Sequence, residues 1–329
     1  FKFKSFMRHL KIASGLLAVV LAFSCQEQTK EQQGTNKQEI EFNYKVTEFA
    51  DIGVLRYQIP GWEELNLQQQ KLVYYLTQAG LSGRDITWDQ NYRHNLAVRK
   101  GLEEIYTNYE GDKSTVEWKQ FETYLNRLWF ANGIHHHYSM DKMKPEFSKE
   151  YLTAISTDAG VQIPMEAVEV LFNDVDAKKV VLDKDKDIVL ESAVNFYEPG
   201  ITTAEAQLFY KTRVADKEKP VEIGLNSRLV RRNGQLMDDV YKSGGLYGEA
   251  IDQIIYWLQL AQGVAETTQQ AKALGLLIEY YRTGSLDTWD EYAIAWSTST
   301  DGAVDWINGF IEVYNDPIAY KGSYETIVQ

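Results

Sequence analysis

The sequence predicts an α+β fold that is predominantly helical and carries a small antiparallel sheet. Through most of the chain after residue 42, apolar residues recur three and four positions apart, which is the spacing of amphipathic helices. Between residues 196 and 242 this spacing changes. There Asn233-Gly234 separates two short apolar runs, which is the strongest short-range signal for a β-hairpin. With 329 residues, the chain is long enough for about two domains.

An export signal is predicted for residues 1–24. Four basic residues lie in the first eleven positions, and an apolar run of about 13 residues follows them. The run is short for a membrane-spanning helix, which needs ~20 residues. Cys25, the only cysteine of the sequence, comes directly after this run, as in a bacterial lipoprotein processing site. Lipidation of Cys25 would anchor the protein to a membrane, whereas an ordinary secretory signal is the alternative.

A flexible tether is predicted over residues 25–43, because residues 26–38 are polar and almost free of apolar side chains. A lipid-anchored protein of this kind would lie in the bacterial cell envelope, and with the alternative signal it would be secreted or periplasmic.

The sequence has 47 Asp and Glu against 34 Lys and Arg, a net charge of -13. This charge repels phosphate backbones and argues against nucleic acid as a partner.

Seven helices are predicted from the apolar spacing, and glycines mark several of their ends. Gly80 is expected to end the first helix, Gly263 separates the last two, and Gly284 follows the final one. The expected helices cover residues 63–79, 87–109, 114–131, 148–155, 165–172, 247–262 and 266–282.

Three consecutive histidines, His135, His136 and His137, suggest a metal site at first sight. Consecutive side chains point in different directions and do not converge on one ion from a helix or a strand. We therefore interpret this stretch as a polar loop and predict no metal ligands. The sequence also lacks an H-E-x-x-H metallopeptidase motif and a G-x-S-x-G nucleophile elbow.

The segment at residues 303–314 has two possible secondary structures. As a helix, it would place Glu312 and Tyr314 about 160° apart. As a strand, it would place them on the same side, about 7 Å apart. The β-branched and aromatic composition favours the strand, but the periodicity leaves both open. A carboxylate and a phenol side by side suit peptide recognition, whereas a half-buried Tyr and an exposed Glu without a role are the structural alternative.

Residues 308–317, with the sequence NGFIEVYNDP, resemble the GFIESYRDP segment of the dipeptidyl peptidase III family. These enzymes are zinc peptidases that release dipeptides from free N-termini. Residues 225–229 (LNSRL) and 280–285 (YYRTGS) are similar to the family's YNTRL and IESFTQGS segments, and Trp296 stands sixteen residues before Glu312, as a Trp does in the family. Val313 and Asn315 replace the family's Ser and Arg, and Ile-Ala-Tyr at 318–320 replaces Phe-Gly-Ser, which indicates a distant, bacterial branch.

The resemblance implies that residues 44–329 form part of the lower lobe of a two-lobed peptidase, and that the small antiparallel sheet of this lobe is barrel-like. The upper lobe of such an enzyme binds zinc, which with a glutamate activates a water molecule for attack on the peptide. The zinc-binding H-E-x-x-G-H helix is absent from this sequence, so zinc is expected as a cofactor of the missing C-terminal lobe. By the same resemblance, Tyr314 is catalytic as an oxyanion donor, Glu312 binds the substrate ammonium, and Trp296 lines the neighbouring subsite.

These implications predict the substrate-binding portion of a peptidase that is inactive as this fragment alone. Its expected partners are peptides with a free N-terminus and the missing zinc lobe. The lipid anchor would also attach it to a membrane. A lipid-anchored helical binding module for peptides or glycans is the alternative. A degenerate family member that serves as a scaffold is a third possibility.

Overall fold

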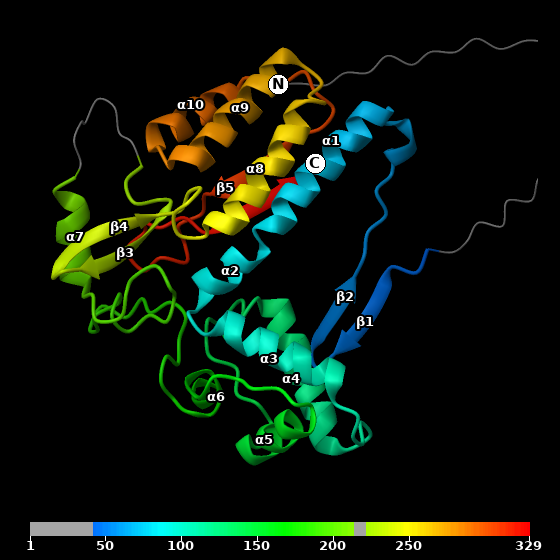
Figure 1. The fold of residues 1–329 in the computed structure, drawn as a ribbon, viewed down its shortest axis with the longest axis vertical. Helices are drawn as coiled ribbons and strands as arrows, with labels where there is room; N and C mark the ends of the chain where they lie inside the picture. Colours follow the sequence, from blue (N-terminus) through cyan, green and yellow to red (C-terminus); the bar gives the residue numbers. More distant parts are fainter. Residues whose placement is uncertain (1–41, 214–221) are drawn as a thin grey trace, which may run out of the picture. The chain divides into compact units, whose positions relative to one another are not determined.

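A computed structural model describes residues 42–213 and 222–329 of the chain (Figure 1). The predicted export signal, Cys25 and nearly all of the predicted tether lie outside these residues. The helices are α1 (Leu67–Ser82), α2 (Arg84–Asn91), α3 (Asn95–Asn108), α4 (Val116–Ala131), α5 (Lys149–Asp158), α6 (Met165–Phe172), α7 (Thr203–Lys211), α8 (Gly248–Gln262), α9 (Thr268–Thr283) and α10 (Leu286–Ser297), with a short 3-10 helix, η1, at Trp62–Glu64. The strands are β1 (Lys45–Phe49), β2 (Ile52–Leu55), β3 (Ser227–Arg232), β4 (Gln235–Val240), β5 (Trp306–Phe310) and β6 (Tyr324–Val328).

The fold class is confirmed: helices dominate, and the strands are antiparallel. Within the described ranges the strands form three two-stranded sheets, β1–β2, β3–β4 and β5–β6, rather than one barrel-like sheet. The predicted hairpin at Asn233-Gly234 joins β3 to β4, and both residues have the positive φ that a type I′ turn requires (52° and 79°). The helices α7 and α10 and the β1–β2 hairpin were not predicted.

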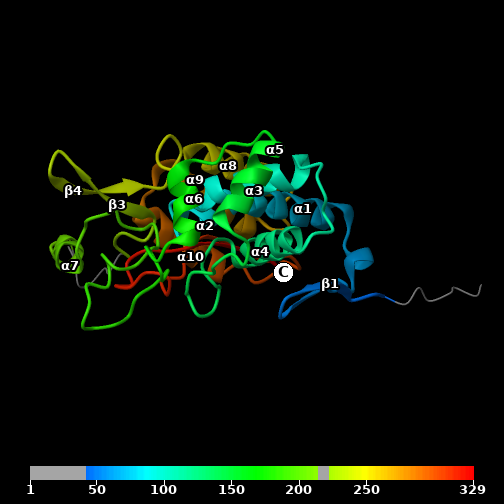
Figure 2. The same cartoon turned by 90° about the horizontal axis from the view of Figure 1, so that it is seen from below.

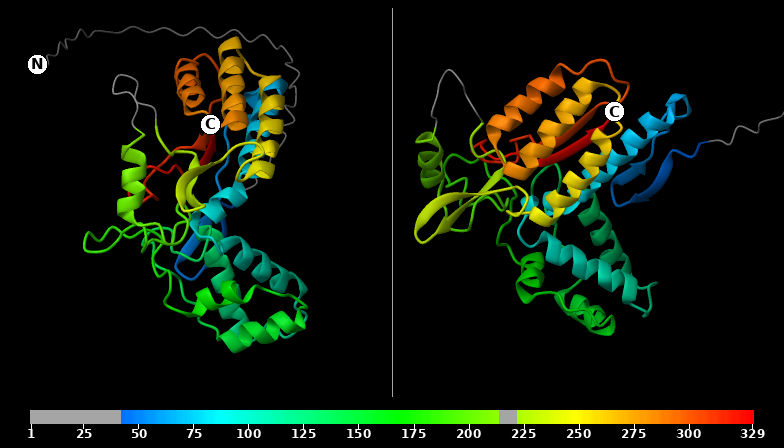
Figure 3. Two further views of the ribbon diagram at one scale, coloured as in Figure 1. Left: turned by 60° about the vertical axis from the view of Figure 1, so that its left-hand side comes forward. Right: turned by 45° about the horizontal axis from the view of Figure 1, so that its top comes forward.

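Residues 44–329 form one compact unit, and its described residues, 44–213 and 222–329, contain three hydrophobic cores. Helices α1, α8, α9 and α10 pack one against the next and share the first core with β5 and β6 (Figures 1 and 3). Helices α3 to α6 surround the second core, and α7 packs with β3 in the third. Figure 2 shows the β1–β2 hairpin next to α4, which it contacts through a Phe49–Phe130 ring pair at 6.5 Å.

The predicted boundaries of the first two helices are wrong. Helix α1 begins at Leu67 and not at residue 63, and long-range packing explains the other two differences. Helix α1 continues through Gly80 to Ser82, because this glycine leaves room for β6: a Cβ at Gly80 would lie 2.6 Å from Thr326 Oγ1. The single helix expected over residues 87–109 is divided into α2 and α3. The chain is extended at Tyr92, whose φ is -169°, and the buried Tyr92 hydroxyl donates to Asp176 Oδ2 at 2.7 Å.

The pairing of α2 with β6 matters for the site. Gln90 of α2 is buried, its side-chain amide donates to the Gly322 carbonyl (3.1 Å), and its oxygen accepts from the Tyr324 N–H (2.8 Å). A single side chain therefore holds the backbone on both sides of Ser323. Among the described helices, none is both long and apolar enough to cross a membrane.

Candidate functional site

The segment that carries Glu312 and Tyr314 follows strand β5. Phe310, the last residue of β5, lies opposite Tyr324 of β6. Beyond this pair the backbones stay side by side, because the Ile311 N–H donates to the Ser323 carbonyl (3.0 Å) and the Ser323 N–H donates to the Glu312 carbonyl (2.9 Å). The strand interpretation is therefore right for residues 306–310 and extended pairing continues to Glu312, whereas the helix interpretation is wrong.

Gly322 makes this close pairing possible. A Cβ at this position would lie 2.7 Å from the Phe310 carbonyl carbon and 2.9 Å from the Ile311 nitrogen. Both are backbone atoms, so no side-chain movement could relieve the contact. The absent side chain of Gly322 therefore allows the backbone before Glu312 to lie directly against the return strand.

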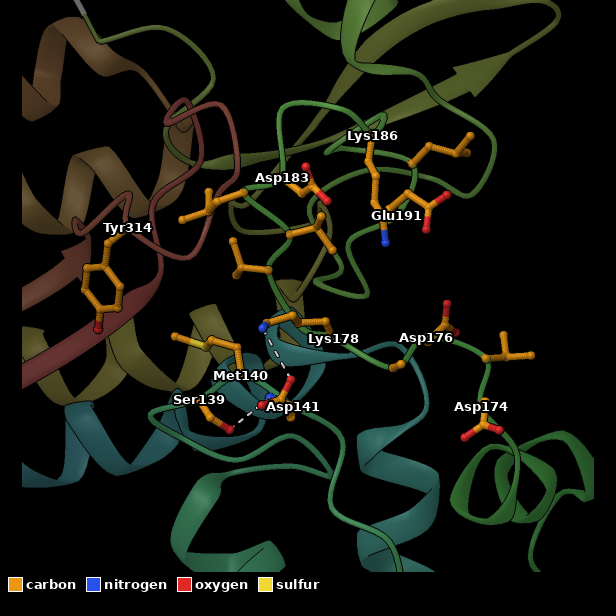
Figure 4. A pocket seen from close by; sticks show the side chains of 16 residues that line it. Ser139, Met140, Asp141, Asp174, Asp176, Lys178, Asp183, Lys186, Glu191 and Tyr314 are labelled. Atoms are coloured by element: carbon orange, nitrogen blue, oxygen red, sulfur yellow. Dashed lines mark hydrogen bonds and ion pairs between the residues drawn. The ribbon is translucent and has the colours of Figure 1, made fainter.

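Tyr314 stands between two pockets and lines both of them. The first has a volume of about 890 Å³ and is formed by residues 139–141, 174–178, 180–183, 186, 190 and 191, with Tyr314 at one end (Figure 4). The second has a volume of about 760 Å³ and lies along β6, where α1 and α2 supply Thr77, Gly80, Leu81, Arg84 and Thr87. The Tyr314 side chain is 63 % exposed, so its hydroxyl is accessible to a ligand.

Two carboxylates act on the Tyr314 phenol. Partial burial raises the pKa of Tyr314 above its usual value, and the negative charges of Glu325 and Glu312 raise it further. Burial likewise raises the pKa of Glu325, with a second contribution from the charge of Glu312. The site therefore combines two mutually repelling carboxylates with a phenol that keeps its proton at neutral pH.

In the structure the charges of Glu312 and of Glu325 both act on the Tyr314 phenol, so Glu325 joins the two residues predicted from the sequence. Sequence reasoning missed Glu325, because its proximity depends on the β5–β6 register, in which it lies opposite Gly309. Only that pairing, and no local motif, could have indicated it.

Trp296 lies on α10 and lines a different pocket from Tyr314. Its indole N–H donates to Asp305 Oδ1 at 2.9 Å. The pocket has a volume of about 170 Å³ and an apolar wall, formed by Trp289, Tyr292, Ala293, Trp296, Trp306, Ile307, Asn308 and Ile311. Ile311, directly before Glu312, connects this pocket to the segment with the candidate site. The structure thus does not place Trp296 beside the phenol.

The histidine stretch is a loop in which His136 is half-buried and His137 is exposed, but the first histidine is buried. His135 is 2 % exposed, and its Nε2 lies 2.8 Å from the Asp176 carbonyl oxygen. Burial lowers its pKa to about 4, so this imidazole is neutral at physiological pH. In residues 42–213 and 222–329, no group of three or more His, Cys, Asp or Glu side chains is arranged to hold a metal ion.

Comparisons with known proteins support the resemblance that the sequence motifs indicated. A model of peptidase family M49 matches residues 185–329. The chain is similar to the structure of DPP III from Caldithrix abyssi, with a TM-score of 0.55 and 20% identity, over 81% of this chain and 40% of that chain. It is also similar to dipeptidyl-peptidase III from Corallococcus sp. strain EGB, with a TM-score of 0.56 and 16% identity, over 82% and 40%.

No curated protein sequence matches the chain. The structural likeness, at these identities, concerns the fold, and this chain spans 40% of the length of each of the two structures. The family match covers the part of the chain that contains the NGFIEVYNDP segment. The peptidase family M49 model thus matches residues 185–329, and the described part of the chain has the fold of the two dipeptidyl peptidase III structures.

Proposed function

We propose that this chain is the substrate-binding portion of a zinc-dependent peptidase that releases dipeptides from the N-termini of peptides. The observation that carries the proposal is that Tyr314 lines two pockets, one of them together with Glu325, and that the charges of Glu312 and Glu325 both act on its phenol. In this proposal a carboxylate accepts hydrogen bonds from the substrate ammonium. Tyr314 donates a hydrogen bond to the carbonyl oxygen of the bond to be cut, where negative charge develops.

The position of the ammonium would determine where the peptide is cut. Two residues in extended form span about 7 Å. An ammonium held by Glu312 would therefore present the second peptide bond at a fixed distance. This arrangement explains the release of dipeptides without recognition of particular side chains. Trp296 and its apolar pocket would receive a neighbouring side chain.

The zinc ion implied by the family would polarise that carbonyl and activate a water molecule. We assign no zinc ligands to the described residues, and we propose that the ion is bound by a zinc lobe outside this sequence. The chain alone should accordingly release no dipeptide from an arylamide substrate, even with added zinc. Dipeptide release at rates typical of the family would contradict this proposal.

Binding of a peptide with a free N-terminus tests the site directly. We expect the chain to bind a C-terminally labelled pentapeptide more tightly than its N-acetylated form, because acetylation removes the ammonium. Fluorescence anisotropy gives both dissociation constants. Glu312→Gln should reduce the preference about fivefold, since a partly exposed ion pair contributes roughly 1 kcal/mol. Glu63→Gln, an exposed acidic residue on η1, is the control.

The alternative function, a helical module that binds peptides or glycans without being part of an enzyme, makes a different prediction. The apolar pocket with Trp289, Trp296 and Trp306 would suit a sugar ring or an aromatic side chain. For such a module, acetylation of the peptide would have no effect, and Trp296→Ala would abolish binding. Equal affinity for the two peptides would therefore favour this alternative over the peptidase.

We further propose that Cys25 is lipidated and anchors the protein to a membrane of the bacterial cell envelope. Metabolic labelling with a radioactive fatty acid tests this. The wild-type protein should incorporate the label and sediment with membranes, and Cys25→Ala should do neither. Label in the Cys25→Ala variant would contradict the proposal.

A further inference from the structure

The loop that joins β5 to β6, residues 311–323, presents Tyr314 at its surface. Across the described part of the chain, the Tyr314 hydroxyl has no hydrogen-bond partner, and the residue is 63 % exposed. Neighbouring side chains therefore do little to fix the phenol. Its position depends mainly on the backbone of the loop that carries it.

Asp316 holds this backbone from inside the loop. It is 4 % exposed, and its N–H donates to the Val313 carbonyl at 2.9 Å. This hydrogen bond closes a tight turn that contains Tyr314. Its carboxylate accepts hydrogen bonds from the N–H groups of Ile318 (3.2 Å), Tyr320 (2.7 Å) and Lys321 (2.8 Å). One buried side chain thus binds the returning half of the loop to the half with Tyr314.

A fourth donor connects the loop to a distant part of the chain. The Tyr197 hydroxyl, which is buried in the third core, donates to Asp316 Oδ2 at 2.8 Å. Burial raises the pKa of the Asp316 carboxyl, while the four hydrogen bonds oppose this rise. A carboxylate is well suited to this place, because it accepts several hydrogen bonds and donates none when it is ionised.

The loop is held at its base as well. The Gly322 N–H donates to the Leu225 carbonyl at 2.8 Å, and the Asn315 side chain donates to Ser323 Oγ at 3.0 Å. These contacts fix the start of the return strand. Asp316 is the group that fixes the part of the loop between Val313 and Lys321.

We infer that Asp316 is a positioning residue, which together with Tyr197 determines where the Tyr314 phenol stands between the two pockets. This inference rests on the proposed peptidase function for its catalytic meaning. The structural statement, that Asp316 controls the position of Tyr314, can be tested without any peptide.

The test uses the purified chain with ¹³C-labelled tyrosine, whose Tyr314 signal is assigned by Tyr314→Phe. We expect the pH titration of Tyr314 in Asp316→Ala to move from its raised pKa toward the ordinary value, because a released loop takes the phenol away from Glu312 and Glu325. Asp316→Asn, which keeps an acceptor oxygen, should titrate more like the wild type. In parallel, Asp316→Ala should reduce the preference for the free over the acetylated peptide by less than the roughly fivefold change expected for Glu312→Gln, because Glu312 keeps its charge.

Tyr197→Phe keeps the test decisive if Asp316→Ala does not fold, since it removes only the hydroxyl. It should shift the Tyr314 titration in the same direction by a smaller amount.

Tyr92→Phe is the matched control, because it removes a buried phenolic hydroxyl that donates to Asp176 at 2.7 Å, and it should leave the Tyr314 titration unchanged. A Tyr314 titration identical to wild type in a folded Asp316→Ala, or equal shifts in Tyr197→Phe and Tyr92→Phe, would overturn the inference. A wild-type chain without preference for the free peptide would contradict the proposed function alone.

Discussion

At the scale of single residues, charge decides what the Tyr314 phenol does. A tyrosine can donate a hydrogen bond to a substrate only while it keeps its proton. Partial burial and the charges of Glu325 and Glu312 raise its pKa, so the phenol remains a donor throughout the neutral and mildly alkaline range. The same carboxylates that would bind an ammonium thus also keep Tyr314 in its donating form.

Glu325→Gln should lower the pKa of Tyr314 toward its ordinary value. The substitution removes a negative charge that disfavours the phenolate, and the side chain keeps nearly the same size. The ¹³C-tyrosine titration measures this shift. Glu312→Gln should act in the same direction with a smaller effect, and a rise in the pKa in either variant would contradict the assigned electrostatics.

Lys321 is a second residue whose charge is important, because it is completely buried. Its ammonium donates to Ser227 Oγ (2.8 Å) and to Asp238 Oδ1 (3.2 Å). Lys321→Met should lower the free energy of unfolding by about 1–3 kcal/mol, since Asp238 loses a charged donor. Lys178→Met, which removes an exposed ion pair with Asp141, should cost under about 1 kcal/mol in the same urea titration.

Lys321 also gives the stability a defined pH dependence. Burial lowers its pKa from 10.5 to about 8. Between these two values the unfolded chain binds a proton that the folded chain has released, so the contribution of Lys321 to stability increases as the pH rises through this window. The stability difference between the wild type and Lys321→Met should therefore widen from pH 8 to pH 10.5. Urea titrations across this range measure it, and a difference that narrows would contradict the lowered pKa.

At the scale of elements, the β5–β6 pair determines the shape of the candidate site. Its register brings Glu325 near the segment after β5, and Gln90 of α2 holds the return strand from the other side. The site is therefore a product of backbone pairing more than of side-chain contacts. Changes that separate the two strands should affect all of its residues at once.

Gly322→Ala should separate them. The new methyl group would lie 2.7 Å from the Phe310 carbonyl carbon, and overpacking against backbone typically costs 1–3 kcal/mol. We expect this loss of stability together with a weaker preference for the free peptide. Gly53→Ala in β2 is the matched control, because no atom lies within 4 Å of its added Cβ, and it should be neutral or slightly stabilising. Equal effects of the two substitutions would argue against the close pairing.

At the scale of the whole molecule, residues 44–329 form one compact unit with several cores. Helix α2 connects the first and second cores, because it contributes Ile86 to the first and Trp88 to the second, and its Gln90 makes buried hydrogen bonds to the return strand. Connections of this kind favour cooperative unfolding. They also imply that damage to one core reaches the candidate site.

Leu125→Ala in the second core and Leu277→Ala in the first should therefore shift the same unfolding transition. Both side chains are fully buried, and such truncations cost roughly 2–5 kcal/mol. Tryptophan fluorescence and far-UV circular dichroism should give coincident urea curves for both variants. Two separate transitions, one for each core, would contradict the connection between them.

Local sequence signals predicted the parts of the fold that depend on local interactions. The helix over residues 165–172 and the turn at Asn233-Gly234 appear as expected, because apolar spacing and positive-φ residues act within a few positions. The interpretation of Gly80 as a helix end is wrong, because the absent side chain of this glycine leaves space for Thr326 of the distant β6. Glu325 was missed for a similar reason, because only long-range pairing brings it to Tyr314.

Tyr314 belongs to the walls of both pockets, and this has a thermodynamic consequence. A ligand in one pocket that reorients the phenol or alters its surroundings must change the affinity of the other pocket for its own ligand. By linkage, the second ligand changes the affinity for the first by the same factor. Two short ligands that each occupy one pocket would therefore cooperate or compete through this tyrosine, and replacing Tyr314 by Ala would make their binding independent.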